Sequence, residues 1–291
     1  IEAAREAYQE ALRLVDELEV PRGRAEPLLG LSLLEAFFGH SHLGLRYGEE
    51  GLAISEQSGD QWLGGMLKIG IGINCFQLGD LEQATNSFRA ARSDFKNCKD
   101  AFCQLASELW LALAFRRAKQ TKSYERALKD LFAGAVNRHY HCLFAQPTLL
   151  GPRDISLLAP LVVDAGKKLK DERSVQGLAS KLGLAGLSYH PGYTLRISSL
   201  GNLRVWRGQE EIGGREWQRE KALELFLLLL MNRGKYLPKE TLYDLLWPEE
   251  DEDTAARNFK VSLNALRKAL EPDRKAQEDS YYVLRNRSNY G

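Results

Sequence analysis

Residues 249–270, EEDEDTAARNFKVSLNALRKAL, form the stretch that says most about the fold of this chain. It begins with five consecutive acidic residues: Glu249, Glu250, Asp251, Glu252 and Asp253. From Thr254 onward, apolar residues recur at the spacing of an amphipathic helix. We predict that this helix begins near Thr254, a residue type that often serves as an N-cap. The acidic residues just before it would interact favourably with the positive end of the helix dipole.

The predicted helix has one apolar face and one polar, partly basic face. The apolar face, expected to pack in a core, consists of Ala256, Phe259, Leu263, Leu266 and Leu270. The opposite face carries Arg257, Asn258, Val261, Asn264, Ala265 and Lys268, with Lys260 and Arg267 at its flanks. Small side chains would let such a helix enter the major groove of DNA, where amides and cations contact base edges or phosphates. Taken alone, its basic residues favour an ordinary amphipathic surface helix.

Two further helices are predicted just before this one. The first spans about residues 218–232 and is followed by Gly234, a helix stop signal. The second spans about residues 239–246. Its apolar stripe is Leu242, Leu245, Leu246 and Trp247. The order of three helices is that of a helix-turn-helix domain.

Strand patterns flank the three helices. Residues 193–198 and 201–208 alternate and are rich in β-branched and aromatic side chains, which predicts a small antiparallel sheet ahead of the helices. After the helices, a strand-like segment, residues 281–284, leads into a turn that carries Arg285 and Arg287. A hairpin in this position would be the wing of a winged helix-turn-helix.

The basic charge of the chain is concentrated near its C-terminal end. The full chain of 291 residues has a formal net charge of only +1. Residues 254–291, in contrast, contain eight Lys and Arg against four Asp and Glu. A nucleic-acid surface on this protein would therefore be a local patch.

Several motifs of this region resemble a known family, and they occur in the family's order. They are WQREKALELFLLLLMNRGK at 217–235, LPKETLYDLLWP at 237–248, AARNFKVSLNALRKALEP at 255–272 and YVL at 282–284. Together they resemble the OmpR/PhoB-type winged helix, in the version used by SARP-family bacterial activators. The resemblance covers about residues 193–291.

This resemblance implies specific roles for three segments. The helix at 254–270 would enter the major groove of double-stranded DNA. The wing, with Arg285 and Arg287, would approach the adjacent backbone or the minor groove. The acidic segment 249–253 occupies the place of the family's loop between the second and third helices, a region that can contact RNA polymerase.

The order of the domains differs from that of SARP proteins, in which the DNA-binding domain usually comes first. The order in this chain is similar to that of large MalT-like regulators, in which an ATPase and a tetratricopeptide array precede a C-terminal DNA-binding domain. The chain begins without Met and inside a helical pattern, so we expect a fragment of a longer protein. The sequence also stops at Gly291, where the second strand of the wing is expected to follow.

The first two thirds of the chain predict a helical repeat array. Helical patterns are interrupted at Pro21, 58–60, 78–80 and 120–123, which gives a repeat of roughly 40 residues, longer than the usual tetratricopeptide unit. One repeat fits the tetratricopeptide consensus well, through Gly72, Gly79, Ala84, Phe88 and Ala91. The fold class is therefore mainly α: a tetratricopeptide-like α-α superhelix followed by a small α+β winged domain. A generic α-bundle is the alternative for the array.

The predicted domains are residues 1–187 and 193–291, with a Gly- and Pro-containing linker at about 183–194. Residues 154–163 and 174–182 would form the last helical pair of the array. The most apolar first helix of a pair, residues 109–117, should lie mostly in the core. Such arrays bind peptides, proteins or a regulator on a concave face, but no individual residue here stands out as a ligand contact.

Composition limits the class of protein to which this chain can belong. Hydrophobic residues make up 44% and charged residues 27%, as in ordinary soluble proteins. No apolar run reaches the roughly 18 residues of a membrane span, and none of the four cysteines forms a CxxC pair, so we expect a cytoplasmic protein without a membrane partner.

Nothing in the sequence indicates an enzyme, a metal site or a cofactor. His40 with His42, and His139 with His141, are spaced by two residues, and such positions do not share a helix face. No phosphate-binding loop of the GxxxxGK[ST] type is present. No combination of Ser, Cys, His and Asp argues for nucleophilic catalysis.

We therefore predict a transcriptional regulator, expected to be an activator, that binds promoter DNA through its C-terminal winged helix and acts as a homo-oligomer on DNA. Its helical array would sense a protein or small-molecule effector or mediate self-association. The alternative is a tetratricopeptide-type adaptor whose C-terminal domain binds protein.

Overall fold

Contacts along the chain divide it into two units, Ile1–Gly183 and Leu184–Gly291, in the computed structural model, which describes residues 2–169 and 173–291. The described part of the first unit is helical. Its elements are α1 (Glu2–Glu17), η1 (Pro21–Arg24), α2 (Ala25–Phe38), α3 (Ser41–Ser58), α4 (Gln61–Leu78), α5 (Leu81–Asn97), α6 (Ala101–Arg117), α7 (Thr121–Asn137), α8 (Cys142–Ala145), η2 (Ile155–Leu158), α9 (Ala159–Lys168) and α10 (Arg173–Lys181).

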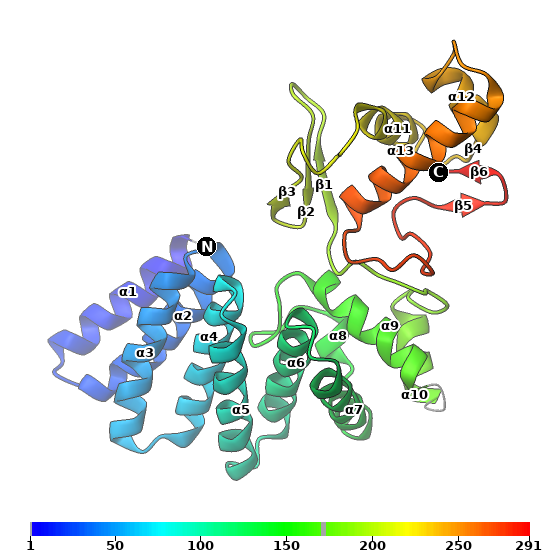
Figure 1. The fold of residues 1–291 in the computed structure, drawn as a ribbon. Coiled ribbons are helices and arrows are strands. Elements are labelled where there is room, and N and C mark those ends of the chain that lie inside the picture. The colour runs from blue at the N-terminus through cyan, green and yellow to red at the C-terminus, as the bar shows by residue number, and fades with distance from the viewer. Residues whose placement is uncertain (1, 170–172) are drawn as a thin grey trace. The chain divides into compact units, whose positions relative to one another are not determined.

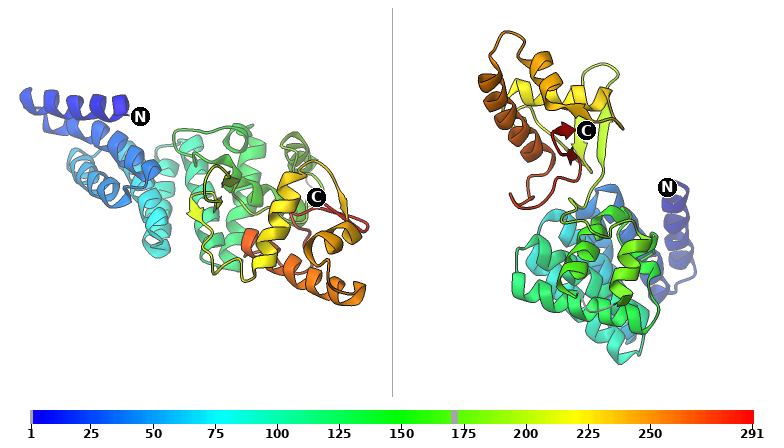
Figure 2. Two further views of the ribbon diagram at one scale, coloured as in Figure 1. Left: turned by 90° about the horizontal axis from the view of Figure 1, so that it is seen from above. Right: turned by 90° about the vertical axis from the view of Figure 1, so that its right-hand side faces the viewer.

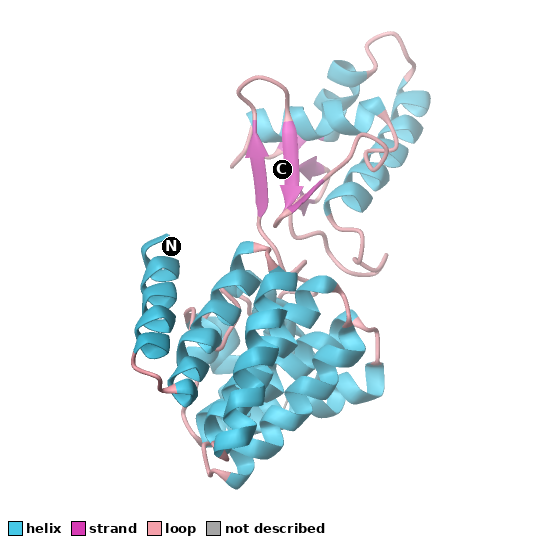
Figure 3. Cartoon of the chain, turned by 90° about the vertical axis from the view of Figure 1, so that its left-hand side faces the viewer, coloured by secondary structure: helices cyan, strands magenta, loops and turns pink. Residues whose placement is uncertain are grey.

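Helices α2 to α7 stand antiparallel and side by side, each beside its neighbour in the sequence (Figures 1 and 3). Turns after the helices of this unit, from α1 to α7, recur every 20 residues. At each turn one residue adopts a left-handed backbone with φ between 54° and 85°: Glu19, Gly39, Gly59, Gly79, Lys99, Lys119 and His139. Two helices therefore occupy 40 residues, in agreement with the predicted repeat length. The array is consistent with a tetratricopeptide-like superhelix.

Aspartate caps set the start of three helices in this array. The carboxylates of Asp60, Asp80 and Asp100 accept hydrogen bonds from main-chain N–H groups in the first turns of α4, α5 and α6, at 3.0, 3.0 and 2.9 Å. Each bond satisfies one N–H group that has no partner within its own helix. These caps, together with the left-handed turn residues, explain why the helices end and restart at a regular interval.

The packing of α4, α5 and α6 depends on one small residue and two aromatic rings. Gly72 of α4 lies so close to the Phe88 ring of α5 that a Cβ atom there would overlap it. The Phe88 ring stacks on Trp110 of α6, with centroids 5.7 Å apart. Trp110 is buried and donates its indole N–H to the carbonyl oxygen of Leu150 at 2.6 Å. As predicted, most of residues 109–117 belong to the core.

The second unit combines two small sheets with three helices (Figure 2). Its elements are β1 (Leu195–Ser198), β2 (Arg204–Arg207), β3 (Glu210–Glu211), α11 (Glu220–Met231), β4 (Leu237–Pro238), α12 (Lys239–Leu246), α13 (Glu252–Leu270), β5 (Arg285–Asn286) and β6 (Asn289–Tyr290). The first sheet has the order β1-β2-β3 and the second has the order β4-β6-β5, all antiparallel.

The hairpin β5–β6 is complete within the chain, so the expectation that its second strand would follow Gly291 was wrong. Asn289 and Tyr290 form that strand and pair with β4 as well as with β5. Main-chain hydrogen bonds between Leu284 and Gly291, at 2.8 and 3.1 Å, extend the pairing by one position. The return strand was missed because a strand of two residues leaves no alternating pattern.

Most of the expected linker packs within the second unit. The main-chain N–H of Asp279 donates to the Ser188 hydroxyl at 2.9 Å, and the His190 ring lies 4.3 Å from that of Tyr281. These contacts join the segment before β1 to the segment before β5. In the described residues, no helix is long and apolar enough to cross a membrane.

Candidate nucleic-acid interface

Helix α13 presents one continuous exposed face. Its exposed members downstream of the first turn are Arg257, Lys260, Val261, Asn264 and Lys268. Successive members are three or four residues apart, apart from the adjacent pair Lys260 and Val261, so they share one side of the helix. We call these five residues the α13 face. It combines three cations with an amide and one small apolar side chain, and nothing in the described ion pairs neutralises its cations.

The opposite side of α13 is buried more broadly than the sequence suggested. Phe259, Leu263, Leu266 and Leu270 lie in the core as predicted. Ala265, placed on the polar face from the sequence, is only 6% exposed and belongs to the core, while Ala256 is partly buried at its edge. The remaining buried positions of the helix are Ala255, Ser262 and Ala269. Because the side chains at these positions are small, neighbouring elements can pack closely against a wider part of the helix surface.

Phe259 packs α13 against two neighbouring elements. Its ring centroid lies 5.3 Å from that of Tyr243 in α12 and 5.1 Å from that of Tyr290 in β6, and both pairs are edge-to-face. Edge-to-face pairs of this kind add to the stabilisation from burial. One side chain of α13 therefore joins the helix both to α12 and to the hairpin.

Helix α12 contributes Leu242, Tyr243 and Leu246 to this core. The sequence also placed Leu245 in its apolar stripe, and this was wrong: Leu245 is 56% exposed. In a helix of eight residues the buried arc is narrow, and Leu242, Tyr243 and Leu246 already fill it.

The start of α13 lies two residues earlier than predicted. Asp251, not Thr254, is the N-cap residue, and its carboxylate accepts a hydrogen bond from the Thr254 main-chain N–H at 3.0 Å. Hydrogen bonds from Thr254 lower the pKa of Asp251. Glu252 and Asp253 form the first turn of the helix, where their charge interacts favourably with its positive end.

The acidic segment is therefore divided between a loop and a helix. Glu250 accepts a hydrogen bond from the side-chain amide of Asn258 at 2.6 Å, and Asp251 caps the helix. Glu249, Glu252 and Asp253 are exposed. Asn258 is partly buried beside this loop and lies next to the α13 face rather than within it.

The C-terminal end of α13 is held by two side chains from outside the helix. The Tyr193 hydroxyl donates to the Leu270 carbonyl at 2.7 Å, and the buried guanidinium of Arg207 donates to the Ala269 carbonyl at 3.2 Å. Carbonyl groups in a last helical turn have no partner within the helix, so both bonds satisfy groups that would otherwise be unpaired. The positive charge of Arg207 is also favourable at this end of the dipole.

Glu271, the residue after α13, connects the helix to the hairpin. Its side chain is fully buried. The carboxylate accepts hydrogen bonds from the main-chain N–H groups of Tyr281 and Tyr282, at 2.6 and 3.2 Å, and from the Ser280 hydroxyl at 2.6 Å. Arg274 lies 3.4 Å from the same carboxylate. Glu271 therefore positions the chain that enters β5.

Arg285 and Arg287 lie on the hairpin, as predicted, and both are exposed. Arg285 donates to the Arg287 carbonyl at 2.7 Å, and its guanidinium lies 5.9 Å from the Tyr290 ring. Arg287 stands in the two-residue turn with φ of +56°, a conformation that side chains other than glycine rarely adopt. The turn is also tied to α12, because the Lys239 N–H donates to the Ser288 carbonyl at 3.2 Å.

Arg267, the remaining predicted site residue, lies at the flank of α13 and is partly buried. Burial lowers the pKa of its guanidinium, and the charge of Arg274 lowers it further. Because it is partly buried, Arg267 does not belong to the exposed α13 face.

Three residues that hold this site were not predicted from the sequence: Tyr193, Arg207 and Glu271. Tyr193 and Arg207 are distant in sequence from the carbonyl groups they bind, and Glu271 lies just outside a helix. Neither situation leaves a periodic pattern in the sequence. A charged residue inside an otherwise strand-like pattern, such as Arg207, was the one feature that could have drawn attention.

Comparison with known proteins identifies the domain. Residues 217–285 match the family described as "Transcriptional regulatory protein, C terminal", and the domain is an OmpR/PhoB-type winged helix preceded by a helical region. This match supports a DNA-binding transcriptional regulator. No curated protein matches the chain.

Proposed function

We propose that this protein regulates transcription by inserting α13 into the major groove of double-stranded DNA while the β5–β6 hairpin lies on the adjacent backbone. The observation that carries the proposal is the α13 face: three cations with no ion pair among the described residues, an amide and Val261 on the exposed side of a helix whose other side is buried. Phe259 packs the helix against α12 and β6, Arg207 bonds its C-terminal end and Glu271 joins it to the hairpin, so the α13 face is held in a fixed position.

The residues of the α13 face divide by the contacts they can make. Asn264 can form paired hydrogen bonds to adenine, and Val261 can pack on a thymine methyl group. Lys260 and Lys268 supply point charges for phosphates, and Arg257 suits either a phosphate or guanine. Affinity would come mainly from the phosphates and specificity from the bases. Asn258 would contribute indirectly, by holding Glu250 in position. Arg267 would contribute by positioning the chain after α13.

The hairpin would add two phosphate contacts. Arg285 and Arg287 are exposed, and the hairpin that carries them is attached to α12 and α13 by Tyr290 and Glu271. A hairpin held in this way keeps its cations at a constant position relative to α13, which reduces the entropy lost on binding.

The acidic residues Glu249, Glu252 and Asp253 would face a second partner. They are exposed and carry negative charge next to a DNA-binding helix, so their own contact with DNA would be repulsive. A basic protein surface such as one on RNA polymerase is the complementary partner, and this would make the protein an activator. The helical array would sense an effector or partner and support assembly on repeated DNA half-sites.

The proposal can be tested by selecting bound duplexes from a random DNA pool with the full chain. We expect a recurring sequence motif, and we expect Asn264→Ala to lose preference at one position of that motif while binding to unrelated DNA changes little. Arg257→Ala should weaken binding to the selected duplex. Failure to bind any duplex at low salt would exclude the proposal and favour a protein-binding adaptor.

A further inference from the structure

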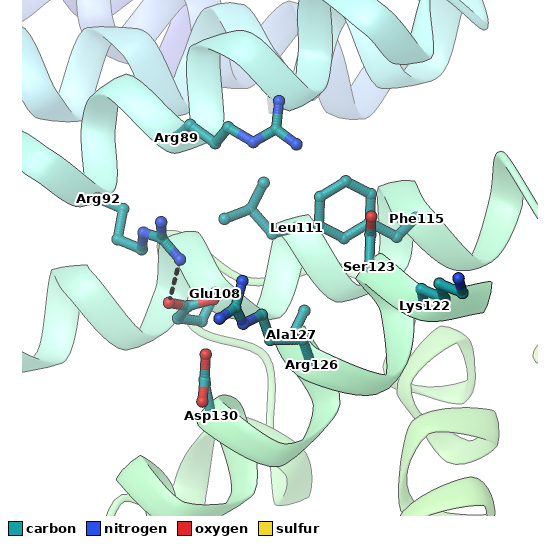
Figure 4. Close-up of a pocket in the computed structure, with 10 residues that line it drawn as sticks. All are labelled: Arg89, Arg92, Glu108, Leu111, Phe115, Lys122, Ser123, Arg126, Ala127 and Asp130. Atoms are coloured by element: carbon teal, nitrogen blue, oxygen red, sulfur yellow. Dashed lines mark hydrogen bonds and ion pairs between the residues drawn. The ribbon is translucent and has the colours of Figure 1, made fainter. Parts of the chain in front are cut away.

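A cavity of about 280 Å³ lies between α5, α6 and α7, within the helical array (Figure 4). Leu111 and Phe115 of α6 form its apolar part. Its polar lining is Arg89, Arg92, Glu108, Lys122, Ser123, Arg126 and Asp130. The volume is close to the lower end of the range of roughly 300–1,000 Å³ found for small-molecule sites.

The charges around the cavity do not balance. Arg92 is paired with Glu108 at 2.7 Å. Within the described residues, no carboxylate lies within ion-pair distance of Arg89, Lys122 or Arg126, so three cations face one remaining acidic residue, Asp130. The cavity therefore has an excess of two positive charges. A ligand with two negative charges would neutralise it.

Arg89 of α5 is already held in an orientation that suits such a ligand. The Arg89 guanidinium lies 5.4 Å from the centre of the Phe115 ring. Stacking on an aromatic face holds the planar group in one orientation, and a guanidinium held in this way can form paired hydrogen bonds to a carboxylate or a phosphate. Arg126 of α7 lines the same cavity (Figure 4).

Glu108 adds an acceptor that the protein itself does not satisfy. This residue is only 7% exposed, and one carboxylate oxygen, Oε1, accepts from Arg92. The other oxygen, Oε2, is buried and has no hydrogen-bond partner among the described residues. Burial raises the pKa of Glu108, and Arg92 opposes this effect. Buried acceptors are seldom left unpaired, so Oε2 points to a donor group on a ligand.

The first turn of α7 provides a further attraction for an anion. Lys122 and Ser123 from this turn line the cavity. Gln120, the N-cap residue of α7, makes no side-chain cap, whereas Asp60, Asp80 and Asp100 cap the three preceding helices. The uncapped N–H groups and the positive end of the dipole are favourable for negative charge.

We propose that this cavity binds a small organic dianion, a phosphate monoester or a dicarboxylate, that carries a hydroxyl or amino group. The anionic groups would bind Arg89, Arg126 and the start of α7, and the hydroxyl or amino group would donate to Glu108. A ligand bound in this way would connect α5 with α7. The inference deepens the proposed effector-sensing role of the array and rests on it only for the regulatory meaning of binding.

The test is calorimetric titration of the full chain, in low-salt buffer without DNA, with glycerol 3-phosphate, malate and inorganic phosphate. We expect saturable one-to-one binding of at least one of the two organic ligands. Arg89→Gln and Arg126→Gln should each weaken it by about tenfold or more, because each removes a charged hydrogen-bonding group. Arg46→Gln, at an exposed α3 position outside the cavity, should bind as the unaltered chain does.

Arg126→Lys separates charge from geometry and should restore only part of the affinity, because lysine cannot form the paired bonds. Absence of saturable binding by either organic ligand, or equal binding by the cavity variants and Arg46→Gln in chains with unchanged unfolding midpoints, would overturn the proposal. A response to inorganic phosphate alone would also overturn it. Since DNA is absent from this assay, DNA binding without dianion binding would remove this inference and leave the proposed function in place.

Discussion

The salt dependence of DNA binding can be calculated from the exposed cations of the winged domain. Three belong to the α13 face, Arg257, Lys260 and Lys268, and two to the hairpin, Arg285 and Arg287. Each phosphate neutralised on B-DNA contributes about 0.9 to the slope of log affinity against log salt, so five contacts, with Arg257 counted as a phosphate contact, predict a slope of about −4.5. Raising salt fourfold, from about 50 to 200 mM, should then weaken binding roughly 500-fold.

Replacing one of these cations changes the slope by a calculable amount. Lys268→Gln removes one contact, so the slope should fall in magnitude by about 0.9, to about −3.6. Across the same fourfold range of salt, affinity should then fall roughly 150-fold instead of 500-fold. Lys268 is exposed and has no ion pair in the described structure, so its replacement should leave the fold unchanged.

The assay is fluorescence anisotropy with a labelled duplex from the selected pool, titrated at four salt concentrations. The matched control is Arg215→Gln, which removes the same charge from an exposed position between β3 and α11. Its slope should equal that of the unaltered chain. If Arg215→Gln lowers the slope as much as Lys268→Gln does, the slope reports net charge alone, and the assignment of DNA contacts to the α13 face is refuted.

Three further predictions concern stability. Glu271→Ala should destabilise the winged domain by about 2–4 kcal/mol in urea unfolding, because two main-chain N–H groups lose a buried charged acceptor, and it should weaken DNA binding by displacing the hairpin. Asp251→Ala should lower the unfolding midpoint at neutral pH. Because the pKa of Asp251 is depressed in the folded protein, its contribution to stability is present above the unfolded pKa of about 4 and is lost as pH falls through the folded value. The midpoints of the variant and the unaltered chain should therefore converge in acid. Gly72→Ala should destabilise the helical array by about 1–3 kcal/mol, since the added methyl group overlaps Phe88.

Controls for these variants lie nearby. Asp273→Ala removes an exposed carboxylate two residues from Glu271 and should change stability little; a loss equal to that of Glu271→Ala would show that general charge at this end matters, not the buried hydrogen bonds. Gly166→Ala, in α9, adds a methyl group that meets no atom within 4 Å, and it should stabilise by about 0.5–1 kcal/mol. Stabilisation by Gly72→Ala as well would contradict the packing argument.

The sequence predicted those features whose cause is local. The apolar spacing of Phe259, Leu263 and Leu266 placed a helix and its buried side, because a helix of 3.6 residues per turn must align such residues. The order of elements in the winged domain followed from similar patterns. In the array, the three left-handed positions occupied by glycine, at 39, 59 and 79, leave a sequence signal; Lys99, Lys119 and His139 adopt the same conformation without one.

Tertiary structure decided what surrounds each of these elements. Ala265 lies in the core and Leu245 in solvent because neighbouring elements cover a helix unevenly, which periodicity alone cannot express. Contacts between distant residues, such as Tyr193 with Leu270 or Glu271 with the chain before β5, are equally invisible in a local pattern. The same holds for the cavity beside Glu108, whose charges come from three helices. Local spacing determined where the helices are, whereas burial and unpaired charge depend on which segments the fold brings together.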